Sequence, residues 1–213
     1  RELVETTFRL TGTHLTYELA IREVDDGTEL GPTGLGRRSP RVTVGRLDHS
    51  LPSYGYRVAG PPRAGSLQVD RLRALGLGPG KWYGQLKAGE SVTMPDGRVV
   101  CGLDYVSDVR PGRVVVVTGD TRPTPRTVEL ARDADVLVHE STYSPAEADL
   151  APRYAHSTCL EAAEIARQAG VGRLLLTHFS ARYSDADLAG LETAARAVFP
   201  ATQVMRDLEE VRI

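Results

Sequence analysis

The sequence of 213 residues has little cysteine and no long apolar run, and both shortages restrict what it can be. Its two cysteines, Cys101 and Cys159, lie far apart without the spacing of a metal site. We therefore interpret them as reduced thiols, with a disulfide as the alternative. No apolar segment approaches the roughly 20 residues that a membrane-spanning helix needs, and the start of the chain lacks the pattern of a signal peptide. These absences favour a cytoplasmic protein that does not enter a membrane.

A general excess of basic residues is also missing, because the formal net charge is −2. Such a net charge does not indicate a nucleic-acid binder, although a local cluster of basic residues can still contact RNA. The content of hydrophobic residues, 41%, is ordinary for a globular protein, and the length suffices for one domain with its own core. The chain opens at Arg1 with no initiator methionine, which is typical of a fragment, a processed chain or a sequence given without its first part. We expect a single domain over residues 1–213.

Short apolar runs alternate with helical patterns in the second half of the chain. They predict buried strands at 113–118, 135–140 and 173–178, and helices at 125–134, 156–170 and 184–199. Thr158 and Glu161 form a capping-box pattern in the helix at 156–170, and Gly170 marks its end. Loops rich in glycine and proline are expected at 25–40 and 59–65, and an excursion from the core at 75–90. Strands alternating with helices indicate an α/β fold in which helices cover a sheet.

Each of the three predicted strands ends in a side chain that can bind a metal or transfer a proton. The first run leads to Asp120, the second ends in His139 and Glu140, and the third ends in His178. Taken singly, such an aspartate is commonly a turn residue and such a histidine a satisfied core residue. Three endings at one edge of a sheet favour a functional site, because ligands gather at the carboxyl ends of strands. Imidazoles and a carboxylate are a donor set that suits zinc.

The motifs around these residues resemble those of ribonuclease Z, a zinc-dependent endonuclease of the metallo-β-lactamase superfamily that processes the 3′ ends of tRNA. TGDT alone would be weak evidence, but TGDT followed by VHEST, HST and THFSARY is specific. The matching segments appear in the family's order and span nearly the whole chain: THLTYELAI (13–21), HSLPSYGYRV (49–58), LGPGKWYGQLKAGESV (77–92), TGDTRP (118–123), DVLVHESTY (135–143), HSTCLEAAEIA (156–166) and LLLTHFSARY (174–183). The resemblance implies an αββα sandwich with an inserted flexible arm.

The resemblance also implies a role for each residue near the strand ends. His49 and His178 correspond to metal ligands, and Asp120 corresponds to the carboxylate that bridges two zinc ions. His156 and Glu140 correspond to the pair that handles the proton of the leaving group, with Glu140 orienting the imidazole. The alternative for Glu140 is a salt-bridged surface acid. No small organic cofactor is implied.

The segment 60–92 resembles the family's arm, which grips tRNA. It is locally basic, since residues 60–90 carry five Lys or Arg against two Asp or Glu. Trp82 and Tyr83 either help to hold RNA by stacking or belong to a core. Arg182, after the third strand, either contacts a phosphate or forms a structural ion pair. The residues expected to contact the substrate are Gly78, Pro79, Gly80, Lys81 and Arg182.

One motif of the family, H-x-H-x-D-H, is missing. In the family it precedes the point where this chain begins, so the chain resembles the carboxyl-terminal two thirds of a ribonuclease Z. Part of the ligand set for the two zinc ions is therefore expected upstream of residue 1. The expected function is removal of 3′ trailers from precursor tRNA, leaving a 3′-hydroxyl, by a homodimer in which one subunit's arm serves the other's active site. The alternatives are another hydrolase of the same fold, a phosphodiesterase or lactonase, or an inactive fragment.

Overall fold

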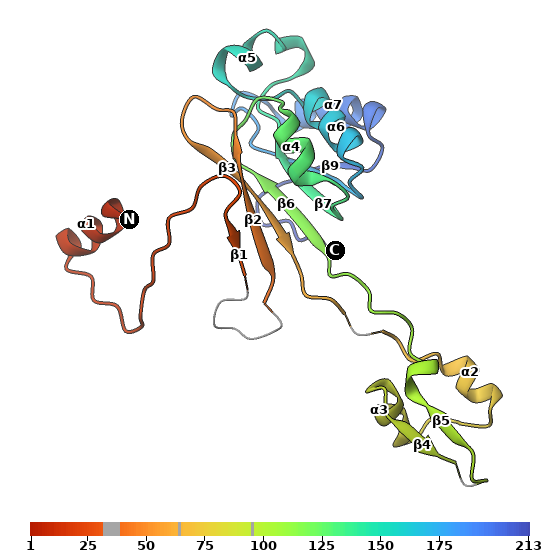
Figure 1. The fold of residues 1–213 in the computed structure, drawn as a ribbon. Coiled ribbons are helices and arrows are strands. Elements are labelled where there is room, and N and C mark those ends of the chain that lie inside the picture. The colour runs from red at the N-terminus through yellow and green to blue at the C-terminus, as the bar shows by residue number, and fades with distance from the viewer. Residues whose placement is uncertain (32–38, 64, 95) are drawn as a thin grey trace.

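A mixed seven-stranded sheet forms the body of the protein (Figure 1). The computed structural model describes residues 1–31, 39–63, 65–94 and 96–213. The strand order is β1-β2-β3-β6-β7-β8-β9, with antiparallel pairing from β1 to β6 and parallel pairing from β6 to β9. The strands are β1 (Glu29–Leu30), β2 (Arg41–Leu47), β3 (Ser53–Ala59), β6 (Val114–Thr118), β7 (Val136–Glu140), β8 (Leu174–Thr177) and β9 (Thr202–Val204).

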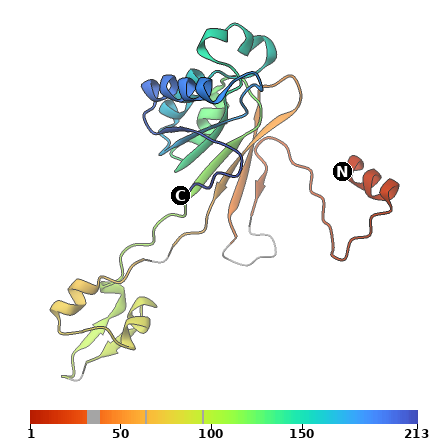
Figure 2. The same cartoon turned by 180° about the vertical axis from the view of Figure 1, so that it is seen from behind.

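The parallel half of the sheet forms from the three apolar runs, so β6, β7 and β8 confirm the predicted strands. Three helices follow β6, β7 and β8 in turn: α4 (Pro125–Ala131), α6 (Cys159–Ala169) and α7 (Asp185–Val198). All three lie on the same face of the sheet (Figure 2). Between the helices and the sheet lies the main core, in which Val116, Leu137 and Leu174 are fully buried. The α/β prediction, with helices covering a sheet, is confirmed.

The caps of α6 are those that the sequence predicts. The Thr158 hydroxyl accepts a hydrogen bond from the Glu161 backbone N–H at 3.2 Å, and the Glu161 carboxylate accepts one from the Thr158 backbone N–H at 2.8 Å. Gly170 ends the helix in the left-handed conformation, with φ at 66°, which a glycine adopts without strain. The cap fixes the start of α6 and therefore the position of the loop that precedes it.

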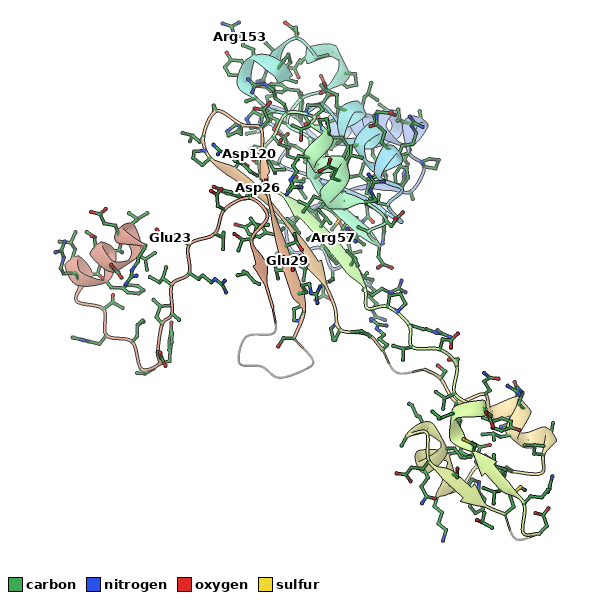
Figure 3. All side chains as sticks on the ribbon, viewed as in Figure 1. Glu23, Asp26, Glu29, Arg57, Asp120 and Arg153 are labelled. Carbon is green, nitrogen blue, oxygen red and sulfur yellow. The ribbon has the colours of Figure 1, made fainter. Side chains whose placement is uncertain are left out.

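Two glycines let α4 approach the sheet closely. A Cβ atom at Gly55 of β3 would lie 2.8 Å from Cδ2 of Leu130, and one at Gly45 of β2 would lie 3.1 Å from the same atom. Arg57 of β3 (Figure 3) donates hydrogen bonds to the carbonyl oxygens of Leu130 and Arg132, where α4 ends. A guanidinium at this position satisfies free carbonyls and faces the negative end of the helix dipole. These contacts hold α4 against β2 and β3.

The basic excursion folds into a small lobe that stands apart from the sheet (Figure 1). Its elements are α2 (Val69–Ala74), α3 (Trp82–Lys87), β4 (Ser91–Thr93), β5 (Val99–Cys101) and the short 3₁₀ helix η1 (Gly102–Asp104). The lobe has a core of its own, formed by Leu72, Leu77, Leu86, Met94 and Val100. It therefore extends beyond residue 92, because β5 completes the hairpin that begins with β4.

A two-stranded ribbon joins the lobe to the sheet. β3 and β6 pair in antiparallel register up to Ala59 opposite Val114, and the same register continues to Arg63 opposite Arg110 and Leu67 opposite Val106. The segment 59–65, predicted as a loop, thus forms one side of this ribbon, with residue 64 outside the described residues. The lobe is an extension of two strands of the sheet.

The remaining elements lie at the ends and edges of the molecule. Helix α1 (Glu2–Thr11) has no buried residue and lies away from the sheet, whereas α5 (Leu150–Tyr154) and η2 (Pro145–Glu147) lie between β7 and α6 in the chain. The loop expected at 25–40 contains β1, and its residues 32–38 lie outside the described residues. Among the described residues no helix combines the length and the apolar character needed to cross a membrane.

Both cysteines are free, as the sequence predicts. Cys159 is buried at the start of α6, and this burial raises the pKa of its thiol to about 11. A thiol with so high a pKa is a poor nucleophile near neutral pH. Cys159 is therefore a structural residue of the core.

Candidate metal and catalytic site

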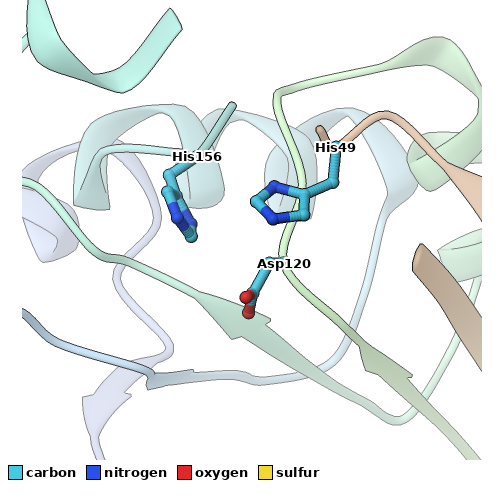
Figure 4. A group of neighbouring side chains, drawn as sticks. All are labelled: His49, Asp120 and His156. Carbon is cyan, nitrogen blue, oxygen red and sulfur yellow. The ribbon is translucent and has the colours of Figure 1, made fainter. Parts of the chain in front are cut away.

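The structure brings together the five residues that the sequence proposes as ligands and proton-transfer groups. Asp120, Glu140 and His178 lie at or just beyond the carboxyl ends of β6, β7 and β8. His49 comes from the β2–β3 hairpin, and His156 comes from the segment between α5 and α6. Figure 4 shows His49 and His156 with their rings beside the Asp120 carboxylate. Residues 129 positions apart in the chain thus share one edge of the sheet, from His49 to His178.

The ring of His156 lies close to the rings of both other histidines. The centroid of His156 lies 4.9 Å from that of His49 and 5.4 Å from that of His178, with the latter pair stacked. Nε2 of His178 lies 3.5 Å from Oδ1 of Asp120. His49, Asp120 and His156 each offer a ligand atom, and these three atoms lie within 4.8 Å of one another. His156 therefore sits in the middle of the group.

Glu140 is a buried acceptor behind this row. Its side chain is only 2% exposed. One carboxylate oxygen accepts hydrogen bonds from the backbone N–H groups of Thr121 and Ser157 and from Nδ1 of His156, at 3.0, 3.1 and 2.9 Å. The other accepts from the backbone N–H and the hydroxyl of Thr142, at 3.0 and 2.9 Å. Because its oxygens are occupied in this way, Glu140 acts as an orienting group, and the interpretation as a surface acid is wrong.

The hydroxyl of Thr142 links three of the functional side chains. It donates its hydrogen to Glu140. Its oxygen can then only accept, and Nδ1 of His178 lies 2.9 Å away and Nδ1 of His156 lies 3.1 Å away. A proton on Nδ1 of His178 leaves the lone pair of that imidazole on Nε2, which faces Asp120. Thr142 is a positioning residue that sequence reasoning missed, although it lies inside the VHEST motif.

A backbone carbonyl orients His49 in the same way. Nδ1 of His49 lies 2.8 Å from the carbonyl oxygen of Ala155. A carbonyl can only accept, so Nδ1 carries the proton and the lone pair of the ring lies on Nε2, where the Ser50 hydroxyl donates to it at 3.3 Å. A metal would take the place of this hydroxyl. Ala155 has a positive φ of 63°, and His178 has one of 56°. Non-glycine residues adopt this conformation at a cost of about 1–3 kcal/mol, and such strain clusters at functional sites.

These contacts fit a metal better than an ordinary ion-pair cluster. His49 and His178 both hold Nδ1 against a protein acceptor, which leaves the lone pair of each ring on Nε2, and Nε2 of His178 lies 3.5 Å from Oδ1 of Asp120. Metal-binding histidines typically have this second contact. The side chains of Asp120 and His178 are 37% and 50% exposed, so an ion can reach them. Glu140 is a poor metal ligand by comparison, because both of its carboxylate oxygens already accept hydrogen bonds from the protein.

We expect Thr142→Val to weaken metal binding about 10- to 100-fold, the range that outer hydrogen bonds to metal-binding histidines contribute. Valine has the shape of threonine but cannot accept from Nδ1 of His178, so the imidazole loses its fixed orientation. Isothermal titration of the metal-free protein with zinc measures the affinity. Thr142→Ser retains the hydroxyl and is the matched control. Equal affinities for the serine and valine variants would contradict the role of this hydroxyl.

His139 does not join the site, although the sequence places it at the same strand end. Successive side chains of a strand point to opposite faces, so Glu140 faces the site and His139 packs toward the helices. His139 is fully buried; its Nδ1 donates to the Glu140 carbonyl oxygen at 2.7 Å, and its Nε2 has no partner among the described residues. Burial lowers the pKa of this imidazole. His139 is a neutral core residue, which corrects its reading as a member of the strand-end group.

The lowered pKa of His139 predicts that the protein loses stability in acid. Below the ordinary imidazole pKa of 6.5 the unfolded chain binds a proton that the folded imidazole does not, so the free energy of unfolding falls as pH falls. One such group contributes a slope of up to about 1.4 kcal/mol per pH unit. Urea unfolding of the metal-free protein at several pH values between about 5 and 8 measures it. His139→Leu should flatten the slope, and His14→Leu, at an exposed histidine, should leave it unchanged; an unaltered slope in His139→Leu would exclude this source.

The residues expected to contact the substrate fall into two groups. Gly78, Pro79, Gly80 and Lys81 lie in the lobe, and Arg182 lies in the turn before α7. Arg182 forms an ion pair with Glu147 at 2.7 Å, which is the structural alternative predicted for it. Its guanidinium also lies over the ring of Tyr143, 5.8 Å from the centroid.

Trp82 and Tyr83 belong to the core of the lobe. Both pack against its buried cluster. Nε1 of Trp82 donates to the Gly78 carbonyl oxygen at 2.9 Å, and the Tyr83 hydroxyl donates to the Leu77 carbonyl oxygen at 3.1 Å. The structure therefore agrees with the alternative that these aromatic residues are core residues. They hold the Gly78-Pro79-Gly80 turn in place.

Arg122 is a further residue that the sequence did not single out. Its guanidinium donates to the Asp48 carboxylate at 3.0 Å and to the Pro152 carbonyl oxygen at 3.1 Å, and its backbone N–H donates to the Asp48 carbonyl oxygen at 2.8 Å. It thereby connects the turn after β6 with the hairpin that carries His49 and with α5. The TGDTRP motif thus carries both a candidate ligand, Asp120, and an arginine that ties the neighbouring loops together.

Comparisons with known proteins agree with this geometry. Residues 95–179 match the model of the beta-lactamase superfamily domain. Over its full length the chain is 46% identical to ribonuclease Z of Lactiplantibacillus plantarum, 45% to ribonuclease BN of Cronobacter sakazakii and 45% to ribonuclease Z of Geobacillus kaustophilus, and it covers 67%, 68% and 68% of these proteins. The chain thus spans about two thirds of the length of these relatives.

Solved structures show the same fold at lower identity. The short form of human tRNase Z superposes with a TM-score of 0.52 and 23% identity, over 85% of this chain and 57% of that one. The metallo-β-lactamase fold protein YhfI of Bacillus subtilis gives 0.51 and 19%, over 85% and 50%. The single sheet and helix layer seen here correspond to part of the αββα sandwich, as the resemblance implies. From these relatives, the fold and the order of its strand-end motifs, the chain belongs to the ribonuclease Z family of the metallo-β-lactamase superfamily.

Proposed function

We propose that this chain supplies the strand-end half of the active site of a zinc-dependent endoribonuclease that removes 3′ trailers from precursor tRNA and leaves a 3′-hydroxyl on the tRNA. The observation that carries the proposal is the pairing of two functions at one edge of the sheet. His49, Asp120 and His156 offer ligand atoms within 4.8 Å of one another, and Nε2 of His178 lies 3.5 Å from Asp120. At the same edge the buried Glu140 carboxylate orients His156. Family membership supports the choice of substrate.

His49, Asp120 and His178 would hold the metal ions, with two zinc ions as the proposed complement. The donor set supports zinc, which accepts imidazole nitrogen and carboxylate oxygen. When bound, the ions would polarise the scissile phosphodiester and activate a water near neutral pH. Two zinc ions need more ligands than these three side chains provide.

His156 is placed to serve the leaving group. Its Nδ1 donates to Glu140, so its Nε2 is the nitrogen that can carry a proton to another group. A 3′-oxygen of ribose is a poor leaving group unless it is protonated, and an imidazole is a side chain that can donate this proton. Glu140 holds the ring in a single tautomer and stabilises the imidazolium before the proton leaves. Since Glu140 is itself fixed by backbone N–H groups from three segments, the ring is held by the fold.

The position of the lobe supports a role in trans. The ribbon leaves the sheet where β6 begins at Val114, whereas Asp120 follows the other end of that strand (Figure 1). A substrate held by the lobe is therefore directed away from the site of the same chain. We propose that the protein is a homodimer in which each lobe, with Gly78, Pro79, Gly80 and Lys81, presents tRNA to the partner's site. We also place it in the cytoplasm, in line with its free thiols.

Removing the lobe together with the ribbon that supports it tests this function. Ala59 and Val114 are opposite each other in the β3–β6 ladder, so an Asn-Gly turn can replace residues 60–113 and close a hairpin. We expect cleavage of precursor tRNA to fall at least about 100-fold, because the lobe no longer holds the phosphate backbone of the substrate. Hydrolysis of a chromogenic phosphodiester, which fills only the site, should stay within about twofold.

The comparison also separates the alternatives. Trailer cleavage that survives removal of the lobe would contradict the proposed role of the arm. A protein that hydrolyses the small diester but leaves precursor tRNA intact before and after the deletion would be a different phosphodiesterase of this fold. Mapping the 3′ end of the product, with and without a chelator, checks both the position of the cut and the need for metal.

A further inference from the structure

Two arginines face each other on the ribbon that supports the lobe. Arg63 and Arg110 exchange both backbone hydrogen bonds, N–H to carbonyl oxygen, at 2.9 and 3.0 Å. In such an antiparallel pair the two side chains lie on the same side of the ribbon, with their Cβ atoms about 5 Å apart. Like charges directly opposite each other destabilise a ribbon. The ribbon therefore carries two adjacent positive charges at a cost to its own stability.

No carboxylate offsets this pair within the described residues. Neither guanidinium takes part in an ion pair or a side-chain hydrogen bond there, and both residues are exposed. Asp108, two residues from Arg110 in the chain, forms no ion pair with either arginine in the described part of the chain. Asp135 is already paired with Arg113, and it also accepts the backbone N–H of Val114.

The arginines border a hollow at the base of the ribbon. It has a volume of about 360 Å³, and its lining comprises Arg63, Arg110, Pro111, Gly112, Arg113 and Asp135. The two strands are in close contact here, since a Cβ atom at Gly112 would lie 2.0 Å from the Gly60 carbonyl oxygen. The backbone next to the two arginines is thus closely packed, and Gly112 leaves no room there for a side chain. The hollow is open to an external group, and two of its three positive charges are uncompensated by any described residue.

We propose that Arg63 and Arg110 form a clamp for the phosphate backbone of RNA at the base of the arm. The inference rests on the proposed function and adds a contact site that lies outside both the strand-end site and the lobe. Guanidinium groups bind phosphate oxygens through paired N–H donors, and two of them on one side of a ribbon can bind the same phosphate or its neighbour. An RNA duplex held by the lobe and extending along the ribbon would place its backbone here. Binding of this kind is independent of sequence.

The substitution Arg63→Glu tests the clamp because it should preserve or raise the thermal stability of the protein while it weakens the binding of RNA. It converts the like-charge pair into an opposite-charge pair across the ribbon, so the thermal unfolding temperature should stay the same or rise. It also removes one phosphate-binding group and engages the other, so binding of RNA should weaken. We expect the Kd for a 12-base-pair RNA duplex of arbitrary sequence to rise about tenfold at 0.1 M salt. The slope of log K against log salt should become shallower by about two, one for each phosphate that the two arginines no longer neutralise.

Arg9→Glu is the matched control. It makes the same change of charge at an exposed position on α1, away from the ribbon in Figure 1. Its salt slope should equal that of the unaltered protein. The double variant Arg63→Gln with Arg110→Gln should reproduce the loss of RNA affinity without introducing a negative charge.

Three results would overturn the clamp. The first is that Arg63→Glu binds the duplex as tightly as Arg9→Glu, and the second is that the unaltered protein shows no salt-dependent binding of the duplex. The third is that Arg63→Glu lowers the unfolding temperature, which would assign these arginines a structural role. Cleavage of precursor tRNA by the unaltered protein is assayed separately. Trailer cleavage combined with unchanged duplex binding in Arg63→Glu would reject the clamp and leave the proposed function intact. Duplex binding that disappears in Arg63→Glu, without trailer cleavage in any variant, would support the clamp and reject the proposed function.

Discussion

Asp120→Ala is expected to reduce kcat/KM for precursor tRNA by at least about 10⁴ and to remove bound metal. If Asp120 bridges two metal ions, as the resemblance implies, it would contribute several kcal/mol by holding both charges near the reacting phosphate, and each 1.4 kcal/mol or so is a factor of ten in rate. The fold should tolerate the change, because the side chain is 37% exposed and its ion pair is with His178 alone among the described residues. Metal analysis of the purified variant and single-turnover cleavage measure the two effects.

A neighbouring aspartate provides the control for Asp120. Asp48 precedes His49 and pairs with Arg122 at 3.0 Å, so Asp48→Ala removes a carboxylate from the same edge of the sheet without removing a proposed ligand. We expect it to retain its metal and to lose activity at most about tenfold through a looser hairpin. Asp120→Ala with normal metal content and near-normal turnover would refute the bridging role.

Glu140→Gln is expected to damage both stability and activity, although it changes a single atom. The amide nitrogen must replace one of the two carboxylate oxygens, and donors converge on both. In either orientation at least one buried backbone N–H then faces another donor, which costs about 1–3 kcal/mol. His156 also loses a charged partner, so the leaving-group step should slow by about 10² to 10⁴, the range for general acid catalysis. Thermal unfolding and single-turnover rates measure these effects.

Glu161→Gln is the same substitution in a different environment. Glu161 completes the capping box of α6, and glutamine can also fill that position. This variant should unfold and turn over like the unaltered protein. If Glu140→Gln were as stable as Glu161→Gln, the hydrogen bonds to Glu140 would not be the buried constraint described here. If it were unstable but fully active, Glu140 would be structural only.

The parallel half of the fold could be predicted from the sequence because each of its elements carries its own signal. Val114 to Thr118 is a continuous apolar run, and Thr158, Glu161 and Gly170 mark the ends of α6 by local chemistry. The short edge strands β1 and β9 have two and three residues, too few for a period to show. The lobe was expected as an excursion, but its core could not be foreseen, since its apolar residues are scattered over 67–105 and meet only after folding.

The sequence motifs predicted the functional side chains of the site, but not the groups that position them. His49, Asp120, Glu140, His156 and His178 were all named from the sequence and all meet at one edge. The groups that were missed act through geometry: the Ala155 carbonyl depends on a left-handed backbone, and Thr142 depends on three partners from different loops. His139 was misplaced because a strand-end motif does not say which face of the sheet each residue occupies. Alternation along β7 decides this in favour of Glu140.

The bridges of the ribbon keep the register of β3 and β6, and this shared register limits how the arm of this protein can change in length. Inserting one residue on one side would unpair the ladder, and inserting one on each side would turn the lobe to the opposite face of the ribbon, since side chains alternate. Adding two residues to each side would lengthen the arm by about 7 Å and preserve its facing. Natural or engineered arms built on this ribbon should therefore differ by multiples of four residues, and their reach should grow in discrete steps.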